Sequence, residues 1–445
     1  MIRNLLVVII LLLGVQQTSL RAQDVWSLQK CVDYALTNNI KIKQGVISTQ
    51  YQQNQLRQSK NSRLPNLNGQ VSQNLNFGRS LTYDNTYKDI NSSETDLGLG
   101  TTIPVFNGFQ ITNSIEKLKL DLMASVEDLS KAKSDISVNI ASTYLEILFD
   151  KELVKVAEDQ LTVTRQQIKQ IGEKVEAGSL ARGSLLEIEA QAAGEDLNLV
   201  NAKNQLQLAK LKLVQLLELE MNDKFDIEVP NLPEISAQAS VVAATEVYKT
   251  AVQFRPEIKG ADLRFQSSKY QLRLAQGTLY PTISLYANVY DSYNNKYTDI
   301  NGKNIDFSSQ LKNNQRKGIG VQMNIPIFTR FQNRLQIDNA RLQVLNTELD
   351  LESARKLLRS DIETAQTNAI AAMNRFSSNQ KAVSSMREAF RYSEEKFSVG
   401  LVNAVEYNTA KTKLAKSESD LLQAKYEFIF RTKLLDLYRG LPLTL

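Results

Sequence analysis

Two segments of the chain alternate apolar and polar residues with the period of two that is typical of β-strands. The first lies between Pro65 and Pro104, and the second lies between Pro281 and Pro326. Helices seldom run through proline, so these prolines should end the helices on either side. The clearest alternation runs from 318 to 325. Its apolar positions are Ile319, Val321, Met323 and Ile325, and the positions between them are Gly318, Gly320, Gln322 and Asn324. The pattern predicts one β-hairpin at about 66–106 and another at about 282–328, each with strands of about ten residues.

The predicted strands have one apolar face and one face of Asn, Gln, Ser and Gly. Such a strand can separate lipid from water, or it can separate a protein core from solvent in an ordinary soluble sheet. About ten residues are enough to cross a bilayer when the strand is tilted. The loop "YDNTYKDINSSET" at 83–95 is polar. These features favour membrane strands, and the soluble sheet is the alternative.

Outside the hairpins the sequence is typical of very long helices. Residues 109–171 contain neither Gly nor Pro, and the same is true of residues 331–399. At 1.5 Å per residue each stretch could extend roughly 100 Å. Each is followed by a turn, at 175–183 and at 397–404, and then by a shorter returning helix. Gly178 and Gly400 suit the left-handed position that ends a helix.

The returning helices carry heptad seams of the coiled-coil type. In the first half the seam has alternating spacings of three and four, with Glu195 filling one step. Its members are Leu185, Ile188, Ala192, Leu199, Ala202, Leu206, Ala209, Leu213 and Leu216. A second seam runs beside it through Leu186, Ala190, Ala193, Leu197 and Val200. A helix with two seams packs against two neighbours, which indicates the wall of a helical tube.

The chain repeats its own organisation. "LRQSKNSRLPNL" at 56–67 matches "LRLAQGTLYPTI" at 272–283, an offset of 216, and "IPVFNGF" at 103–109 matches "IPIFTRF" at 325–331, an offset of 222. A six-residue insertion must therefore lie between 283 and 325. We expect two structural repeats, 24–235 and 236–445.

The composition argues against most catalytic and metal-binding functions. The chain has no histidine and one cysteine, so the usual metal ligands and the usual general base are missing, and we expect no enzyme, cofactor or metal site. A net charge of +5 over 445 residues does not suggest a nucleic-acid partner. The apolar run Leu5–Val15 predicts a signal peptide over 1–23. Cys31 should be a buried small hydrophobe without a lipid anchor.

Four strands per chain cannot close a barrel in lipid, where every strand edge must be paired. Two chains would supply eight strands, whose interior is filled by side chains, and three chains would supply twelve and leave a passage. The sequence therefore predicts a homotrimer. The same threefold symmetry would place twelve helices in a tube.

The predicted signal peptide, the duplicated halves, the Pro-bracketed hairpins, "IPVFNGF", "IPIFTRF" and the glycine-centred turns together resemble the TolC-like outer membrane efflux protein family. The resemblance implies a mainly α fold with a small β part. Duplicated long-helix hairpins would form an α-helical barrel in the periplasm, and the strands would contribute to a twelve-stranded trimeric β-barrel in outer membrane lipid. Implied partners are a periplasmic adaptor protein and an inner-membrane pump or exporter.

The resemblance also implies sites. The four prolines would mark barrel-tunnel junctions, and the two turns would be periplasmic tips. Related sequences often carry acidic residues six and nine positions after each tip glycine. These positions are Ser184 and Glu187 in the first half and Glu406 and Thr409 in the second. The two glutamates would then line a gate, or they are solvated residues at helix starts.

Two other protein classes remain compatible with parts of the sequence pattern. A periplasmic adaptor would have one helical hairpin flanked by soluble β-domains, and a trimeric surface fibre or adhesin could use heptads and hairpins without transport.

Overall fold

The computed structural model describes residues 25–81, 85–220, 225–230 and 241–442. The predicted signal peptide lies outside the described residues. The fold is mainly helical with a small β part, as the sequence predicts. No described helix is long and apolar enough to cross a membrane.

The chain divides into two compact units, and each takes segments from both halves of the sequence. One comprises residues 45–129 and 256–356 and is called here the sheet unit. The other comprises residues 1–44, 130–255 and 357–445 and is called the tip unit. The two compact units therefore do not coincide with the two expected repeats, 24–235 and 236–445. The reason is that the two longest helices run through both units.

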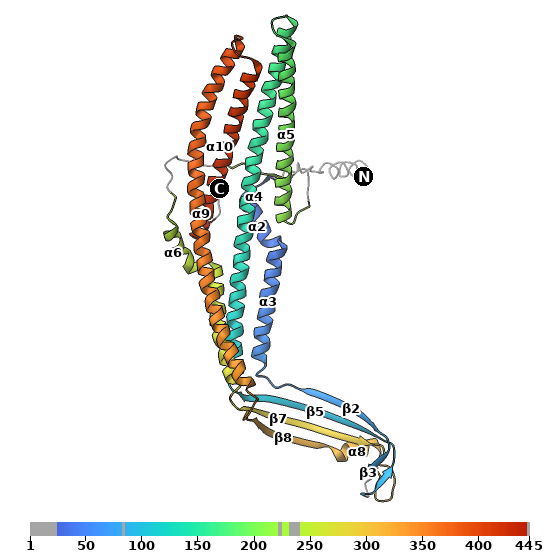
Figure 1. Cartoon of the computed structure of the whole chain (residues 1–445). Coiled ribbons are helices and arrows are strands. Elements are labelled where there is room, and N and C mark those ends of the chain that lie inside the picture. Colours follow the sequence, from blue (N-terminus) through green and yellow to red (C-terminus); the bar gives the residue numbers. More distant parts are fainter. Residues whose placement is uncertain (1–24, 82–84, 221–224, 231–240, 443–445) are drawn as a thin grey trace, which may run out of the picture. The chain divides into compact units, whose positions relative to one another are not determined.

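The sheet unit contains one four-stranded antiparallel sheet (Figure 1). Its order is β2-β5-β7-β8, so the pairing of β5 with β7 joins the two predicted hairpins into one sheet. β5 and β7, with 16 and 13 residues, exceed the predicted ten. The strand bounds are β2 Asn68–Asn76, β5 Ser92–Asn107, β7 Thr282–Asn294 and β8 Arg316–Asn324.

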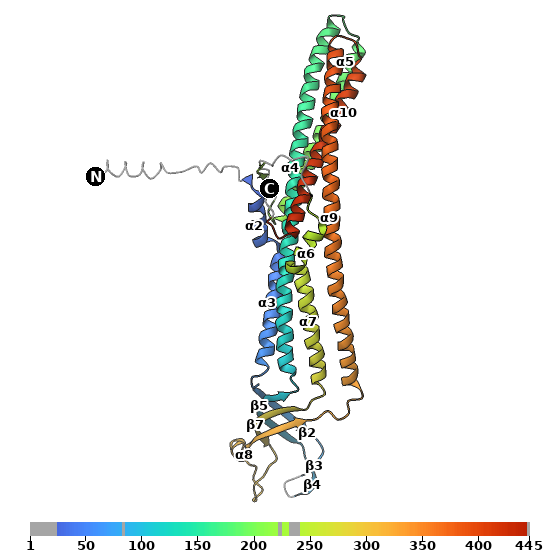
Figure 2. The same cartoon turned by 90° about the vertical axis from the view of Figure 1, so that its left-hand side faces the viewer.

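Three short elements in the hairpin loops were not predicted. In the first loop β3 (Arg79–Leu81) pairs with β4 (Tyr87–Asp89) as a small separate hairpin (Figure 2). In the second loop lies α8 (Phe307–Asn314), capped by the Asp306 side chain. The six-residue insertion expected between 283 and 325 therefore falls in a segment that contains an additional helix.

Three of the four prolines lie between elements, and Pro104 does not. Pro65 precedes β2, Pro281 precedes β7 and Pro326 follows β8, whereas Pro104 lies inside β5. The pairing register shifts between Pro104 and Phe106, and the strand continues to Asn107. A bulge accommodates a residue that cannot donate a ladder hydrogen bond. Pro104 therefore does not mark the end of the β segment, whereas the predicted end of the hairpin at about 106 lies close to Asn107.

The register gives the sheet two chemically different faces. Ile103, Leu285 and Val321 are paired across three strands and lie on one face. The adjacent row, Thr102, Tyr286 and Gly320, lies on the other. On the apolar face, Ile319 is 77% exposed, Val71 is 74% exposed and Val321 is 68% exposed. This face is largely uncovered by the described part of the chain.

The sheet is flanked in sequence by helices that form the rest of the sheet unit. α3 (Ile40–Asn61) leads into β2, and α7 (Pro256–Gly277) leads into β7. α4 (Gln110–Glu176) follows β5, and α9 (Gln332–Ser398) follows β8. Ala275 of α7 packs against Ile337 and Ala340 of α9 in a small apolar core. α4 and α9 have 67 residues each, which confirms the two predicted very long helices.

The tip unit contains two helical hairpins (Figure 1). α4 turns back into α5 (Arg182–Leu216), and α9 turns back into α10 (Ala404–Tyr438). Both returning helices have 35 residues and are shorter than α4 and α9, as predicted. α2 (Leu28–Asn38), α6 (Ala244–Phe254) and the parallel pair β1 (Val25–Trp26) and β6 (Asp226–Ile227) complete the unit.

The first heptad seam packs inside the tip unit, and the second does not. Every position of the first seam on α5 is buried or half-buried, including Glu195 at 6% exposed. On the second seam Leu186, Leu197 and Val200 are 55%, 60% and 57% exposed. The second seam is therefore an apolar stripe without a partner among the described residues.

Cys31 is fully buried in α2, as expected for a small hydrophobe. Burial raises the pKa of its thiol to about 12, so the thiol stays protonated at neutral pH. Nearby, the hydroxyl of Tyr144 on α4 donates to the Trp26 and Glu228 carbonyls, at 3.1 and 2.7 Å. These bonds attach the β1–β6 pair to α4.

The buried carboxyl of Asp150 on α4 should make the folding stability of the protein depend on pH. The residue is 2% exposed, its Oδ2 has no hydrogen-bond partner among the described residues, and burial raises the carboxyl pKa to about 6. An unfolded aspartate titrates near pH 3.9, so the folded state favours the proton. The associated stability is present below about pH 4 and is lost as pH rises through about 6. The thermal midpoint should fall over this interval, and Asp150→Asn should flatten the fall in circular-dichroism melts. An equally steep fall in the variant would contradict the assignment.

Candidate functional site at the helical tips

Both tips use the same turn, and each turn requires its glycine. Gly178 and Gly400 have φ values of 74° and 78°, which side chains rarely adopt. After α4, the Gly178 N–H donates to the Val175 carbonyl at 3.0 Å and the Ser179 N–H donates to Lys174 at 2.9 Å. This pair of bonds is the Schellman motif, which satisfies the last carbonyls of a helix.

The second tip repeats this motif after α9. The Gly400 N–H donates to Phe397 at 3.1 Å, and the Leu401 N–H donates to Lys396 at 2.8 Å. A Cβ built on either glycine would meet no atom within 4 Å, so the surroundings of both tips are open. The helical-turn interpretation of the two glycines is therefore confirmed.

The two returning helices start differently. The Asn403 side chain accepts the Glu406 N–H at 2.9 Å and caps α10, whereas Ala181 gives α5 no side-chain cap. Glu406 lies in the first turn of α10, where the helix dipole favours a negative charge. Its repeat equivalent, Ser184, is half-buried in the first turn of α5. The first turn of α10 therefore carries a carboxylate that the first turn of α5 lacks.

A groove between α5 and α10 brings together two of the predicted site residues. Glu187 of α5 and Thr409 of α10, which are repeat equivalents, both line this groove of about 510 Å³. Thr409 donates its hydroxyl to the Val405 carbonyl at 2.7 Å, while Glu187 is exposed. Ser184, Glu406 and the two glycines are not among the lining residues. The structure therefore joins Glu187 with Thr409 and separates them from the other candidates.

The groove also contains residues that sequence reasoning did not identify. Lys413 and Lys416 of α10 line one side, and the Asn408 Oδ1 is buried without a hydrogen-bond partner among the described residues. Ala190 and Val405 add apolar surface. Such a groove can bind a side chain that has both polar and apolar parts. The ammonium groups of Lys413 and Lys416 can bind a carboxylate there. The only sequence signal was that these residues follow the second tip at helical spacing.

The second tip also exposes apolar side chains. Val399 is 69% exposed, Leu401 is 75% exposed and Val405 is 57% exposed. Neighbouring exposed apolar residues at the end of a helical hairpin are unusual on a free surface and are typical of an interaction site.

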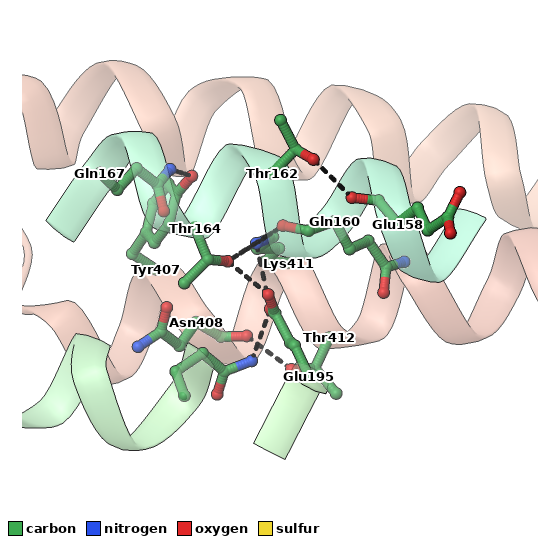
Figure 3. A network of polar contacts seen from close by, with 11 residues as sticks. Glu158, Gln160, Thr162, Thr164, Gln167, Glu195, Tyr407, Asn408, Lys411 and Thr412 are labelled. Atoms are coloured by element: carbon green, nitrogen blue, oxygen red, sulfur yellow. Dashed lines mark hydrogen bonds and ion pairs between the residues drawn. The ribbon is translucent and has the colours of Figure 1, made fainter. Parts of the chain in front are cut away.

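A buried charged network lies deeper in the tip unit (Figure 3). Lys411 of α10 donates to Glu195 Oε1 at 3.0 Å, to the Gln160 carbonyl at 3.1 Å and to the Thr164 hydroxyl. The side chains of Lys411 and Glu195 are only 8% and 7% exposed. The network therefore connects α10 with α5 and with α4, at the level of one turn in each helix.

The network is almost fully satisfied, which explains how charges are tolerated there. Glu195 also accepts from the Thr164 hydroxyl and from Gln191 Nε2 at 2.9 Å. Beside it, Tyr407 is 1% exposed, accepts a hydrogen bond from Gln167 and stacks on Phe397 with ring centroids 4.9 Å apart. Burial raises the pKa of Tyr407 to about 12, so its hydroxyl remains neutral. The two helical hairpins are thus joined by a specific polar layer.

Comparison with known proteins identifies the family. The sequence model described as "Outer membrane efflux protein" matches residues 31–218 and 247–437, which is most of the chain. The chain belongs to the outer membrane efflux protein family. The resemblance drawn from the sequence is therefore confirmed. This efflux protein resides in the outer membrane, with its helical part extending into the periplasm, and its family consists of transport channels and not enzymes.

Individual relatives are distant in sequence and similar in fold. The outer membrane efflux protein BepC of Brucella suis biovar 1 (strain 1330) is 20% identical over 360 residues, covering 81% of this chain and 74% of the relative. The outer membrane protein TolC of Escherichia coli (strain K12) is 23% identical over 365 residues, with 80% and 72% covered. Among solved structures, CusC has a TM-score of 0.79 at 18% identity, with 93% of this chain and 92% of that chain covered. VceC from Vibrio cholerae has a TM-score of 0.77 at 18% identity, with 94% of this chain and 97% of that chain covered.

Proposed function

We propose that three copies of this efflux protein form a channel-tunnel that conducts substrates passively from the periplasm to the outside. A periplasmic adaptor and an inner-membrane pump or exporter would deliver the substrate. The family match argues against the two other classes considered from sequence, a periplasmic adaptor and a surface fibre.

The open, two-faced sheet is the observation that carries the proposal. β2 and β8 are the outer strands of the order β2-β5-β7-β8, and neither has a second partner strand in the described part of the chain. The apolar face with Val71 and Val321 is exposed, while the other face carries Gln70, Tyr286 and Gln322. In lipid an unpaired strand edge costs several kcal/mol per group, so β2 should pair with β8 of a neighbouring copy. Twelve strands are the smallest closed set that leaves a passage.

Exposed apolar residues on the flanking helices support the same contact. α3 leads into β2 and exposes Ile47 and Tyr51 at 63% and 61%. α9 follows β8 and exposes Leu335, Leu342 and Leu349, seven residues apart, at 60%, 63% and 63%. Pairing β2 with β8 of the next copy would bring these two stripes near each other. The exposed second seam of α5 offers a similar surface in the tip unit.

Disulfide trapping tests the proposed closure. In a Cys31→Ser background, Gln70→Cys on β2 would be combined with a cysteine introduced at each β8 position from 316 to 324. For at least one combination, oxidation of membranes should give cross-linked species on a gel, and the largest of them should contain three linked chains. The matched control places the second cysteine at Thr102 of the interior strand β5. A ladder ending at two chains, or no linkage at any β8 position, would contradict the trimer.

The second tip is the proposed contact with the adaptor. Leu401 is 75% exposed, so replacing it with aspartate removes no packing within the chain. A charge at this point should instead be buried without a partner in a docked complex, at a cost of several kcal/mol. Leu401→Asp should therefore reduce efflux, measured as drug accumulation in cells, more than tenfold while trimers persist. Unchanged efflux would remove this tip from the docking surface.

Glu187 and Glu406 are the proposed acidic residues of the gate. If the glutamates of three copies converge on one constriction, charges about 8 Å apart interact by roughly 2 kcal/mol at an effective dielectric near 20, and the field favours cations. Glu406→Lys should shift the reversal potential in a salt gradient from cation towards anion preference. Glu348→Lys, an exposed site on α9, serves as the control. Identical reversal potentials for Glu406→Lys and the wild type would exclude Glu406 from the gate.

A further inference from the structure

The second hairpin loop and the start of β8 together carry an excess of basic residues. The loop, residues 295–315, contains three lysines and two carboxylates, and β8 begins with Arg316 and Lys317, whereas residues 77–91 of the first hairpin loop contain two basic side chains and two carboxylates. The basic residues are Lys296, Lys303, Lys312, Arg316 and Lys317, all exposed. The excess positive charge therefore lies on the loop that contains α8 and on the first two residues of β8.

Both carboxylates of this loop are occupied by the backbone. Asp299 Oδ1 accepts the Asn301 and Lys303 N–H groups, each at 2.9 Å. Asp306 accepts the Ser309 N–H at 3.0 Å as the cap of α8. None of the loop's lysines forms an ion pair with a described residue. The ammonium groups are thus left without internal counter-ions.

α8 covers the apolar face of the sheet and not the polar one. Phe307 of α8 packs edge-on against Tyr293 of β7, with ring centroids 5.0 Å apart. Leu311 lines a hollow of about 360 Å³ together with Val71, Leu97 and Leu99 of the apolar face. Figure 1 shows α8 beside β7, at the end of the sheet away from α3. In the proposed channel this position is on the outside, near the outer rim.

On β7 and β8 the apolar face ends near α8, whereas on β2 it continues to the exposed Leu75. On β8 the apolar positions Val321 and Ile319 are followed on the same face by Lys317, which pairs with Val289. On β7, Val289 is followed on that face by Asp291, which is 9% exposed. A change from apolar to charged residues on a lipid-facing surface marks the boundary with the lipid headgroups, and aromatic residues such as Tyr293 and Phe307 are typical there.

These observations place a basic, unpaired surface at the level of the outer-leaflet headgroups. We propose that α8 and its loop bind the phosphate groups of a phosphorylated glycolipid in the outer leaflet, through Lys296, Lys303, Lys312 and Lys317. Arg316 is excluded, because it pairs with Tyr290 and lies on the polar face. The inference rests on the proposed function, since it requires the apolar face to contact lipid.

The chemistry of the surface fits this ligand. Ammonium groups bind phosphate oxygens as mobile point charges and suit a headgroup layer whose phosphates are not fixed in one geometry. Each lysine near an anionic lipid surface raises the affinity for that surface several-fold. Four lysines should therefore raise the affinity for the phosphorylated lipid at least tenfold. Phe307, 47% exposed, adds an apolar contact at the interface.

The test uses the full-length protein in phosphatidylcholine nanodiscs. Native mass spectrometry would measure binding of lipid A with both phosphates and of the same lipid without them. The wild type should bind the phosphorylated form at least about tenfold more tightly, and Lys→Gln at the four positions should remove the preference. Equal binding of the two lipids by the wild type would overturn the proposal. Hydrogen exchange of the α8 amides, slowed only by the phosphorylated lipid, gives a readout that needs no variant.

A matched control separates local recognition from net charge. Four exposed lysines elsewhere would be changed to glutamine, giving the same charge difference: Lys41, Lys43, Lys60 and Lys133. This control should keep the preference, and an equal loss in both quadruple variants would overturn the proposal. Planar-bilayer conductance of the same preparations tests the channel separately. A conducting wild type without lipid preference contradicts only the headgroup site, and a non-conducting wild type contradicts the proposed function.

Discussion

Replacing Val321 with arginine should prevent assembly in the membrane, whereas replacing its neighbour Gln322 with arginine should be tolerated. Val321 is 68% exposed on the apolar face, and Gln322 lies on the polar face paired with Ser284. An arginine facing lipid near the bilayer midplane costs roughly 2–4 kcal/mol, and each trimer would carry three copies. The polar face would meet water, where the same charge costs little.

The measurement is the heat-modifiable mobility of the assembled protein on gels, together with its yield in outer-membrane fractions. Gln322→Arg is the matched control, because it has the same charge and bulk one residue away on the same strand. We expect assembled Val321→Arg to fall at least tenfold relative to Gln322→Arg. Equal yields of the two variants, or the reverse order, would show that the assignment of faces to lipid and water is wrong.

Lys411→Met should produce the largest loss of stability in the helical part. The substitution leaves the Glu195 carboxylate buried at 7% exposure without its counter-ion. Breaking a buried ion pair in this way typically costs about 3–5 kcal/mol. Removing both charges in Glu195→Leu/Lys411→Met should restore much of the stability, since well-packed apolar pairs often replace buried ion pairs without penalty.

Thermal melts of the helical circular-dichroism signal would measure these changes. Lys131→Met is the control, because Lys131 and Asp135 form an ion pair at 2.5 Å with side chains 46% and 52% exposed. Such a surface pair contributes at most about 1 kcal/mol. If Lys411→Met and Lys131→Met have the same thermal midpoint, the buried network does not stabilise the junction between the two hairpins.

Most of the architecture could be predicted from sequence because its signals are local and long. The uninterrupted stretches 109–171 and 331–399 lack Gly and Pro, and they became α4 and α9. The period-two segments became the four strands of the sheet. By contrast, β3, β4 and α8 are too short to show a period, and alternation does not reveal the bulge between Pro104 and Phe106.

The candidate site was less predictable because it depends on contacts between distant segments. Lys411 and Glu195 are 216 residues apart, and neither was identified as part of a network. Glu195 did leave a signal, since it interrupted an otherwise apolar seam. The repeat pairs Glu187 with Thr409 as equivalents, and only the fold shows that they line the same groove. Whether the acidic residues face a passage depends on neighbouring copies, which sequence spacing within one chain does not encode.

Single-channel recording of the purified protein in planar lipid bilayers tests the central claim most directly. If three copies close the four-stranded sheet of β2, β5, β7 and β8 into a barrel, addition of the trimer should produce discrete and uniform conductance steps. Val321→Arg, added at the same concentration, should insert and conduct at least tenfold less often. Assembled trimers that never raise the conductance of the bilayer would contradict the channel and would favour a structural role for this sheet.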